Sequence, residues 1–339
     1  MFLFNDYYTP RELTGYARAA LADRPINQFS FSRWLPDVRI DDLDYRFTRS
    51  GEGLIEAATY RQWDTPAQTA SRPGLTRVSG ELPPISRKIP LTEYNRLKQR
   101  ANGGDGTFGG LLKRDAVRLV KSIDAKLEYL RAQALVTGAV SLSENGVTAT
   151  VTFGRDAGMS VTAAVTHATA STDVLTDLLT WTQAYTDLNG VPPGVIVTST
   201  TVVTNWLKNT AFRQFAWPNG TPPTRLGLAP LQGVFADYNL PPIVICDRSV
   251  NLAGTSTKIL ATDKVLFLPA DGSELGATLF GTTVEAISSD YDLIGEEAPG
   301  IVVGNWETKD PITLWTKADA VALPVLANPS LAMVADVVP

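Results

Sequence analysis

The stretch of the chain that decides the fold is Trp306–Val338, which reads WETKDPITLWTKADAVALPVLANPSLAMVADVV. Residues 311–326 are rich in β-branched and apolar side chains, which favours a long extended segment. The pair Asn328-Pro329 follows as a strong turn signal, and residues 331–338 form a second apolar run. The stretch therefore predicts a β-hairpin with unusually long strands.

The clearest helical pattern covers residues 108–137, and Gly138 supplies a stop. At 1.5 Å per residue, about thirty residues make a rod of roughly 45 Å, which suits a helix laid across a sheet. The apolar residues recur every three or four positions and form one stripe: Leu112, Ala116, Leu119, Ile123, Leu127, Leu130 and Ala134. The charged residues are expected largely outside this stripe: Arg114, Lys121, Asp124, Glu128 and Arg131.

The amino-terminal segment begins with the capping box Thr9-Pro10-Arg11-Glu12, which predicts a helix to about Leu21. One face of this helix would carry Leu13, Tyr16, Ala17 and Ala20. Periodicity is then lost, although large apolar side chains continue. Either this part forms an irregular lobe with its own core, or it is an arm that packs on a neighbouring subunit. The apolar residues concerned are Phe29, Phe31, Trp34 and Leu35.

Residues 45–92 differ in composition from their surroundings. Extended runs at 53–63 and 87–91 enclose a segment rich in proline and glycine. A long excursion of this kind is usually functional or disordered, so a loop that reaches a partner and a surface insertion both remain open. Seven basic residues outnumber the four acids here: Arg46, Arg49, Arg61, Arg72, Arg77, Arg87 and Lys88.

The middle of the chain has an α/β pattern. Ser171 or Thr172 is expected to cap a helix that ends at Asn189-Gly190. Before it, alternating apolar residues on both sides of Asn145-Gly146 predict a β-hairpin. Three further strands and one helix are expected: strands at residues 195–198, 243–246 and 259–268, and a helix at 200–208.

The composition excludes several classes of protein. The 339 residues, 44% hydrophobic and 19% charged, are typical of a globular chain with room for more than one lobe. A net charge of −5 argues against a protein that coats nucleic acid through a generally basic surface. The single cysteine, Cys246, suggests a reducing compartment. Neither a membrane-spanning run nor a secretory signal is present, so we expect no membrane contact and a protein made in a cytoplasm.

Catalytic and ligand-binding patterns are weak. The one histidine, His167, lies in a Thr/Ala-rich stretch expected at the surface, so it offers no metal site and no clear nucleophile pair. The glycines at 103–110 lack a P-loop lysine. The acidic run at 290–297 lacks the framework of a calcium loop. We therefore expect that the protein is not an enzyme. We expect no catalytic, cofactor-binding or metal-binding residues and no cofactor.

Several residues carry a resemblance to a known family. The order of the segments resembles that of lambda-type major capsid proteins of tailed bacteriophages, the phage capsid protein E family: an arm, a basic extended loop, a glycine hinge, a spine helix, a hairpin, an α/β lobe and a long carboxyl-terminal hairpin. The helix end Leu135-Val136-Thr137-Gly138 supports it. The most specific residues are Trp306, Asp310, Pro311, Pro324, Asn328 and Pro329.

The resemblance implies an α+β fold of the Hong Kong 97-like type, with an amino-terminal arm, an extended loop, a spine helix, a peripheral domain and an axial domain. On this chain the expected boundaries are arm 1–44, extended loop 45–92, peripheral domain 93–170 and 265–339 with spine helix 108–137, and axial domain 171–264.

The resemblance also implies a function: self-assembly into the icosahedral shell that encloses a phage genome. The expected partners are other copies in pentamers and hexamers, a scaffolding protein, a portal and a decoration protein. The shell would enclose double-stranded DNA without sequence-specific binding, as a virion capsid assembled in the host cytoplasm. The expected assembly-interface residues are Trp34, Arg49, Arg61, Trp63, Arg72 and Arg77, and the expected hinge residues are Gly103, Gly104 and Gly106.

Two alternatives remain open from the sequence. One is another phage structural protein such as a tail-tube subunit, against which the long spine helix argues. The other is a cytoplasmic α/β enzyme, which the lack of a convergent set of catalytic groups does not favour.

Overall fold

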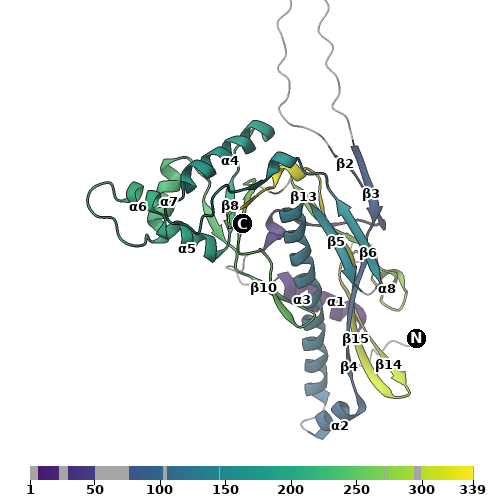
Figure 1. Ribbon diagram of the computed structural model, residues 1–339. Helices are drawn as coiled ribbons and strands as arrows, with labels where there is room; N and C mark the ends of the chain where they lie inside the picture. The colour runs from purple at the N-terminus through teal and green to yellow at the C-terminus, as the bar shows by residue number, and fades with distance from the viewer. Residues whose placement is uncertain are drawn as a thin grey trace, which may run out of the picture.

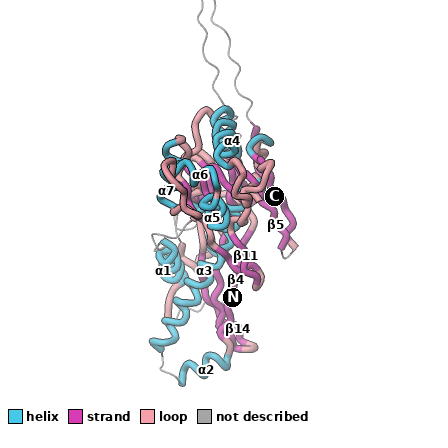
Figure 2. Tube along the Cα trace, turned by 60° about the vertical axis from the view of Figure 1, so that its left-hand side comes forward, coloured by secondary structure: helices cyan, strands magenta, loops and turns pink. Residues whose placement is uncertain are grey.

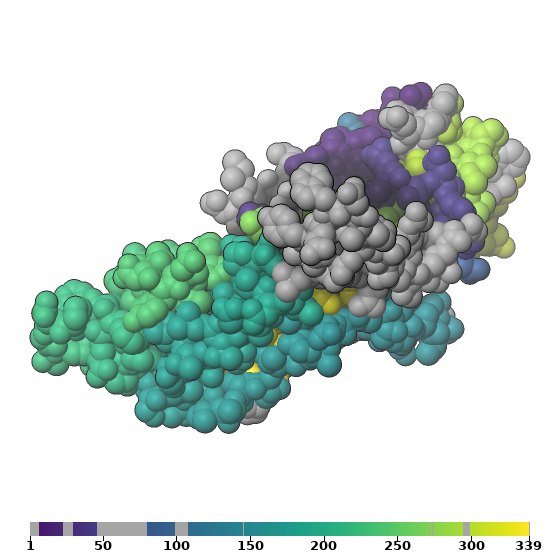
Figure 3. Space-filling model, turned by 90° about the horizontal axis from the view of Figure 1, so that it is seen from above, coloured from purple at the N-terminus to yellow at the C-terminus, as the bar shows by residue number. Residues whose placement is uncertain are grey.

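The structure is a computed structural model and describes residues 7–22, 30–49, 76–101, 105–144, 146–270, 272, 274–293 and 299–338. Its centre is the helix α3 (Asp105–Thr137), which lies along an elongated body (Figure 1). The helix α2 (Glu93–Ala101) lies at one end of this body and α4 (Val174–Asn189) lies near the other (Figure 2). A lobe built from the middle of the chain extends to one side (Figure 3).

The helix α3 confirms the predicted spine helix and begins three residues earlier than expected. All seven residues of the predicted apolar stripe are buried, and the helix packs against β15. Gly138 ends it with a φ of +66°. Beyond this glycine, the guanidinium of Arg155 donates to the carbonyls of Ala134 and Val136 in the last turn of the helix.

The main sheet supports one side of α3. Its strand order is β1 (Asp37–Arg39), β13 (Gly276–Gly281), β15 (Ile312–Leu326) and β14 (Val302–Lys309). The strand β4 (Pro84–Leu91) pairs with residues 314–321 of β15, on the edge opposite to β14. The predicted extended run at residues 87–91 is confirmed, and it is part of this sheet.

The predicted hairpin around Asn328-Pro329 is wrong. The strand β15 forms its hairpin with β14 instead, and the turn contains Asp310 and Pro311. Asn328 precedes a short 3-10 helix, Pro329–Leu331, which carries the chain to β16 (Met333–Asp336) in a second sheet. The apolar run after Pro329 is therefore not the partner of β15, because it is a buried strand between two other strands, β12 and β7.

The second sheet forms the core of the lobe. Its order is β7 (Ser160–Thr162), β16, β12 (Lys264–Leu268), β8 (Val195–Thr198) and β9 (Ile243–Ile245). The sheet thus combines β8 and β9 of the expected axial domain with β7, β16 and most of β12, which lie in segments expected in the peripheral domain. The helices of the lobe are α4, α5 (Thr200–Lys208), α6 (Thr210–Ala216) and α7 (Leu228–Asp237).

Some of the helix and strand boundaries predicted for this lobe are correct and others are wrong. The strand at 195–198 and the helix at 200–208 are confirmed, and Gly190 ends α4. The cap of α4 is Asp173, whose side chain accepts from the N–H of Thr176, so the expected Ser171 or Thr172 cap is wrong. The strand expected from residue 259 begins at Lys264.

Three two-stranded ladders complete the described part. The hairpin of β5 (Ala139–Glu144) and β6 (Val147–Thr152) confirms the prediction after the spine helix. The hairpin of β10 (Ser249–Leu252) and β11 (Thr255–Lys258) lies in the chain segment that connects β9 to β12 of the second sheet. The strands β2 (Asp44–Arg49) and β3 (Thr76–Glu81) pair at the base of the expected extended loop. The extended run expected at 53–63 lies outside the described residues.

The amino-terminal helix α1 (Pro10–Ala22) covers the outer edge of β14. Its capping box is confirmed, since Thr9 and Glu12 exchange hydrogen bonds of 2.9 and 3.2 Å. The buried face includes Leu13 and Ala17 as expected, whereas Tyr16 is 47% exposed. Thr14 is also buried: its hydroxyl accepts from the N–H of Val303 at 3.0 Å and lies 3.2 Å from the carbonyl of the same residue.

Thr14→Val tests this edge contact. The substitution keeps the shape of the side chain but leaves two buried backbone groups of Val303 without a partner, so we expect a loss of about 1–3 kcal/mol in the free energy of unfolding. Denaturant titration measures it. Thr14→Ser is the matched control, because it keeps the hydroxyl and should lose less. Equal losses in the two variants would show that the hydroxyl contributes nothing.

Candidate assembly site

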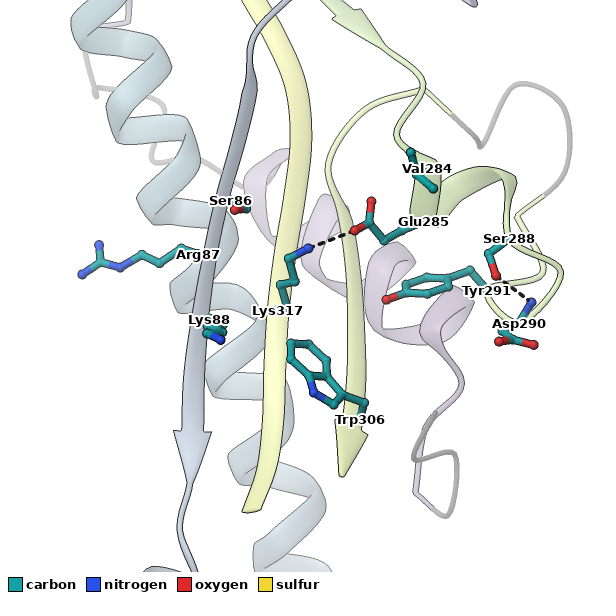
Figure 4. A pocket seen from close by; sticks show the side chains of 10 residues that line it. All are labelled: Ser86, Arg87, Lys88, Val284, Glu285, Ser288, Asp290, Tyr291, Trp306 and Lys317. Atoms are coloured by element: carbon teal, nitrogen blue, oxygen red, sulfur yellow. Dashed lines mark hydrogen bonds and ion pairs between the residues drawn. The ribbon is translucent and has the colours of Figure 1, made fainter. Parts of the chain in front are cut away.

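An apolar recess of about 620 Å³ opens beside the β14–β15 hairpin (Figure 4). Its sheet wall is set by the strand register, which places Lys88, Lys317 and Gly304 side by side on β4, β15 and β14. Tyr291 lies against Gly304, where a Cβ atom would come within 2.3 Å of the tyrosine hydroxyl. The glycine is therefore what lets the aromatic ring approach the sheet so closely.

Lys317, one of the charged residues of the recess, is paired with two acids. The Nζ of Lys317 donates to Glu285 at 2.9 Å and lies 2.8 Å from Asp319. Burial raises the pKa of Asp319 to about 6, against the opposing effect of Lys317. Burial also raises the pKa of Tyr291 to about 12, so this phenol stays protonated near neutral pH. The arrangement therefore supplies paired ions and aromatic surface, which suit the docking of a polypeptide better than chemistry on a substrate.

The rim of the recess carries exposed aliphatic side chains. Val284 and Ile287 on the short helix α8 (Val284–Ile287) are 82% and 74% exposed. The indole of Trp306 lies in the recess and is nearly buried. Exposed apolar side chains next to an aromatic floor are typical of a surface that contacts another protein.

A buried guanidinium joins segments that are far apart in the sequence. Arg131 is fully buried; its Nε donates to the hydroxyl of Thr278 at 2.8 Å and its Nη1 to Glu128 at 2.9 Å. Its Nη2 donates to Asp37. Asp124, Glu128 and Arg131 were expected only to lie outside the apolar stripe of α3, and the structure shows that they are nevertheless buried. The helical pattern alone does not show that other segments supply partners for these charges.

Glu128 extends this arrangement to the amino-terminal segment. Its carboxylate accepts from the backbone N–H of Phe31 and from the hydroxyl of Ser30 at 3.0 Å. Thr278 in turn donates to the carbonyl of Leu35 at 3.0 Å. We call the group of Arg131, Glu128, Asp37 and Thr278 the guanidinium network.

The expected interface residue Trp34 lies in this same segment, and its side chain belongs to the subunit's own core. It is 1% exposed, and its indole N–H donates to the carbonyl of Pro269 at 2.9 Å. Phe31 and Leu35 are fully buried beside it. The interpretation of an irregular segment packed on its own chain therefore fits these residues, and we do not propose Trp34 as a contact between subunits.

The remaining expected site residues are only partly described. Arg49 lies in β2 and Arg77 in β3, where they pair with Thr76 and Thr48 respectively. The side chains of both arginines lie outside the described part of the structure. Gly106 lies in the first turn of α3, so a hinge before this helix would have to lie at residues that precede Gly106. The others lie outside the described residues: Arg61, Trp63, Arg72, Gly103 and Gly104.

His167 is buried, so its expected surface position is wrong. Its Nδ1 accepts from the indole N–H of Trp206 at 3.2 Å, which leaves the proton on Nε2, 3.1 Å from Asp177. Burial lowers the pKa of His167, while Asp177 opposes this effect. The ring also stacks on Trp181. This packing could not be predicted from local patterns, because the partners of His167 lie on two helices, α4 and α5. No serine contacts the imidazole among the hydrogen bonds of the described chain.

Metal and membrane signals are absent from the described ranges. No group of His, Cys, Asp and Glu side chains there could hold a metal ion. Of the acidic run, Asp292 lies 3.9 Å from Arg11 and Asp290 lines the recess, whereas residues 294–298 lie outside the description. None of the described helices is both long and apolar enough to cross a membrane.

Solved structures share this architecture. The chain is similar to a protein described as a prophage capsid protein from E. coli CFT073, with a TM-score of 0.64 and 14% identity over 99% of this chain and 100% of that one. It is also similar to a phage-related protein of Bordetella bronchiseptica RB50, with a TM-score of 0.59 and 12% identity over 95% and 94% of the two chains. A third similar structure is the capsid of cyanophage P-SCSP1u, at 0.51 and 12% over 93% and 91%. At such low identities these likenesses show the fold, which is the Hong Kong 97-like capsid fold.

The family follows from the sequence itself. The model of the family "Phage major capsid protein E" matches residues 47–337, which is most of the chain. The chain belongs to this family. This membership supports the function of a phage major capsid protein over that of a tail-tube subunit or a cytoplasmic enzyme. No curated protein matches the chain.

Arg131→Met tests the guanidinium network. Removing the guanidinium leaves the buried Glu128 without its hydrogen-bonded cation, and of the cations in the described chain only Arg248 remains, at 3.9 Å. We therefore expect a loss of about 3–5 kcal/mol in the free energy of unfolding. Chemical denaturation provides the measurement. Lys126→Met is the control, because the pair of Lys126 with the exposed Glu144 should contribute only about 0–1 kcal/mol. Similar losses in both variants would contradict the special role of Arg131.

His167→Gln tests the buried imidazole. The unfolded chain takes up a proton near pH 6.5, whereas the folded lobe resists protonation, so the stabilisation is complete above that pH and is lost as the pH falls toward the folded-state pKa. We therefore expect the wild type to lose more stability than the variant between pH 7.5 and 5.5. Thermal melts across this range measure the difference. Parallel pH profiles would mean that His167 is not the titrating group.

Proposed function

We propose that this major capsid protein assembles into a closed icosahedral shell that encloses double-stranded DNA, with its subunits grouped in pentamers and hexamers. The observation that carries the proposal is the family match over residues 47–337, supported by the capsid fold of the whole chain. Assembly of this kind needs complementary surfaces and no catalytic step. The recess with its paired ions fits that requirement.

One proposed contact lies at the far end of the lobe. Phe215, Trp217 and Tyr238 are 46%, 50% and 37% exposed on or beside α6 and α7. The rings of Phe215 and Tyr238 lie edge to face at 5.3 Å, which holds them in a defined orientation. Exposed aromatic groups are typical anchors of protein interfaces. We assign them to contacts between lobes of neighbouring copies around a symmetry axis.

A second proposed contact involves the segment between β2 and β3. Arg49, Arg61, Arg72 and Arg77 supply positive charge there, and Trp63 supplies an apolar anchor. Single surface ion pairs contribute only about 0–1 kcal/mol. Their effect becomes large when every subunit of a shell repeats the same contact. Gly103 and Gly104 would then act as a hinge between α2 and α3.

The proposal extends to partners and place. A scaffolding protein, a portal and a decoration protein would act with the shell, and assembly would take place in the host cytoplasm. The DNA would be enclosed without sequence-specific recognition. Pairing of the charges in the recess supports a structural role for the chain.

Replacing residues 52–73 by a four-residue Gly/Ser linker tests the second contact. The linker leaves the β2–β3 ladder in place, so the subunit should stay folded and soluble. We expect closed particles from the wild type, and only free subunits or small rings from the variant, because the contacts to neighbours are lost. Light scattering and negative-stain microscopy give the measurement.

A matched variant, Arg61→Gln with Arg72→Gln in the full chain, separates charge from length. It should form shells that become unstable at lower salt than the wild type tolerates, if the charges hold neighbours together. Normal closed particles from the linker variant would overturn the assigned contact. Open tubes from the wild type would overturn the proposed shell.

A further inference from the structure

Three basic residues form an exposed stripe on α3. Arg114, Arg118 and Lys121 are spaced by four and three residues and are all exposed. At 3.6 residues per turn they lie on one face of the helix, opposite to the apolar residues that contact the sheet. At 1.5 Å per residue the stripe is about 10.5 Å long. We call these three residues the basic stripe.

Repulsion between the like charges of the stripe opposes the folding of α3. Arg114 and Arg118 are like charges four residues apart, and Arg118 and Lys121 are three apart, which destabilises a helix. The stripe lies in the first half of α3, so the negative end of the helix dipole does not attract it. Within the described chain no ion pair is recorded for any of the three, although Asp115 interacts with Arg118 and Arg114 at longer range. Local arrangements that oppose folding stability are expected at functional sites.

We propose that the basic stripe binds the phosphate backbone of the double-stranded DNA inside the shell. This inference rests on the proposed shell function, and it assigns α3 to the inner wall. Two strands of duplex DNA carry one negative charge per 1.7 Å or so of axis, so a stripe of this length faces several phosphates. The contact involves no base edges and is independent of sequence.

The negative net charge of the chain restricts DNA contact to the basic stripe. With a net charge of −5, most of the surface repels DNA, so contact is restricted to a local basic patch. Three cations per subunit bind weakly one at a time. Repetition over the wall of a shell would hold the DNA loosely, because each contact exchanges easily with salt.

The test uses the full chain at a concentration where it is unassembled, with a fluorescent 24-base-pair duplex as probe. Anisotropy gives the association constant between 50 and 200 mM salt. We expect the triple variant Arg114→Gln, Arg118→Gln, Lys121→Gln to bind more weakly and its log–log salt slope to fall by about 2.7, which is 0.9 per lost phosphate contact. An unchanged slope would overturn the proposal.

Three controls complete the test. Lys98→Gln, Arg225→Gln, Lys309→Gln removes the same charge from exposed positions elsewhere and should leave the slope unchanged. Arg118→Gln should weaken DNA binding without lowering the melting temperature, since the repulsion that it removes from Arg114 and Lys121 offsets the lost attraction to Asp115; a lower melting temperature would indicate a structural role instead. Polyglutamate should compete more weakly than DNA; if it competes as well as DNA, the site is one for an acidic protein.

The outcome for the shell is read separately. If the triple variant forms normal closed particles but loses DNA affinity, both the shell function and the stripe are supported. If it forms normal particles and keeps its DNA affinity, the stripe is wrong and the shell function stands. If the wild type never forms shells, the proposed function fails whatever the DNA result.

Discussion

The buried guanidinium of Arg131 is the interaction on which the rest of the structure depends. A buried charge is costly unless it is paired and hydrogen-bonded, and here three donor atoms of one side chain are satisfied by Glu128, Thr278 and Asp37. Through Glu128 the same network holds the backbone of Phe31. One side chain therefore fixes the amino-terminal segment, the spine helix and the main sheet relative to one another.

The strand β15 connects the main sheet to the lobe. Its 15 residues pair with three neighbours in the main sheet, and the chain then passes through the turn Pro329–Leu331 into β16 of the second sheet. Because consecutive strands lie in different sheets, the body and the lobe share one continuous piece of chain. Such a connection suits a subunit that must present several contact surfaces in fixed relative positions.

Much of this fold could be predicted from local patterns, and the errors have physical causes. The apolar stripe of α3, its end at Gly138 and the capping box at Thr9 depend on nearby residues, so they were found. The hairpin at Asn328-Pro329 was wrong because a turn signal does not reveal which strands pair across a distance. His167 was placed at the surface, and the burial of Glu128 was not predicted, because their partners come from elsewhere in the chain. The apolar recess, built from four separate segments, left no contiguous signal, whereas Arg114 and Lys121 of the basic stripe could be predicted to lie outside the apolar stripe.

The guanidinium network makes the amino-terminal segment a permanent part of the subunit's core. Native-state hydrogen exchange on the wild type can test this by comparing the amides of residues 30–39 with those of α3. We expect both sets to exchange only through global unfolding, with the same free energy of opening. Exchange of residues 30–39 that is orders of magnitude faster than that of α3 would contradict it.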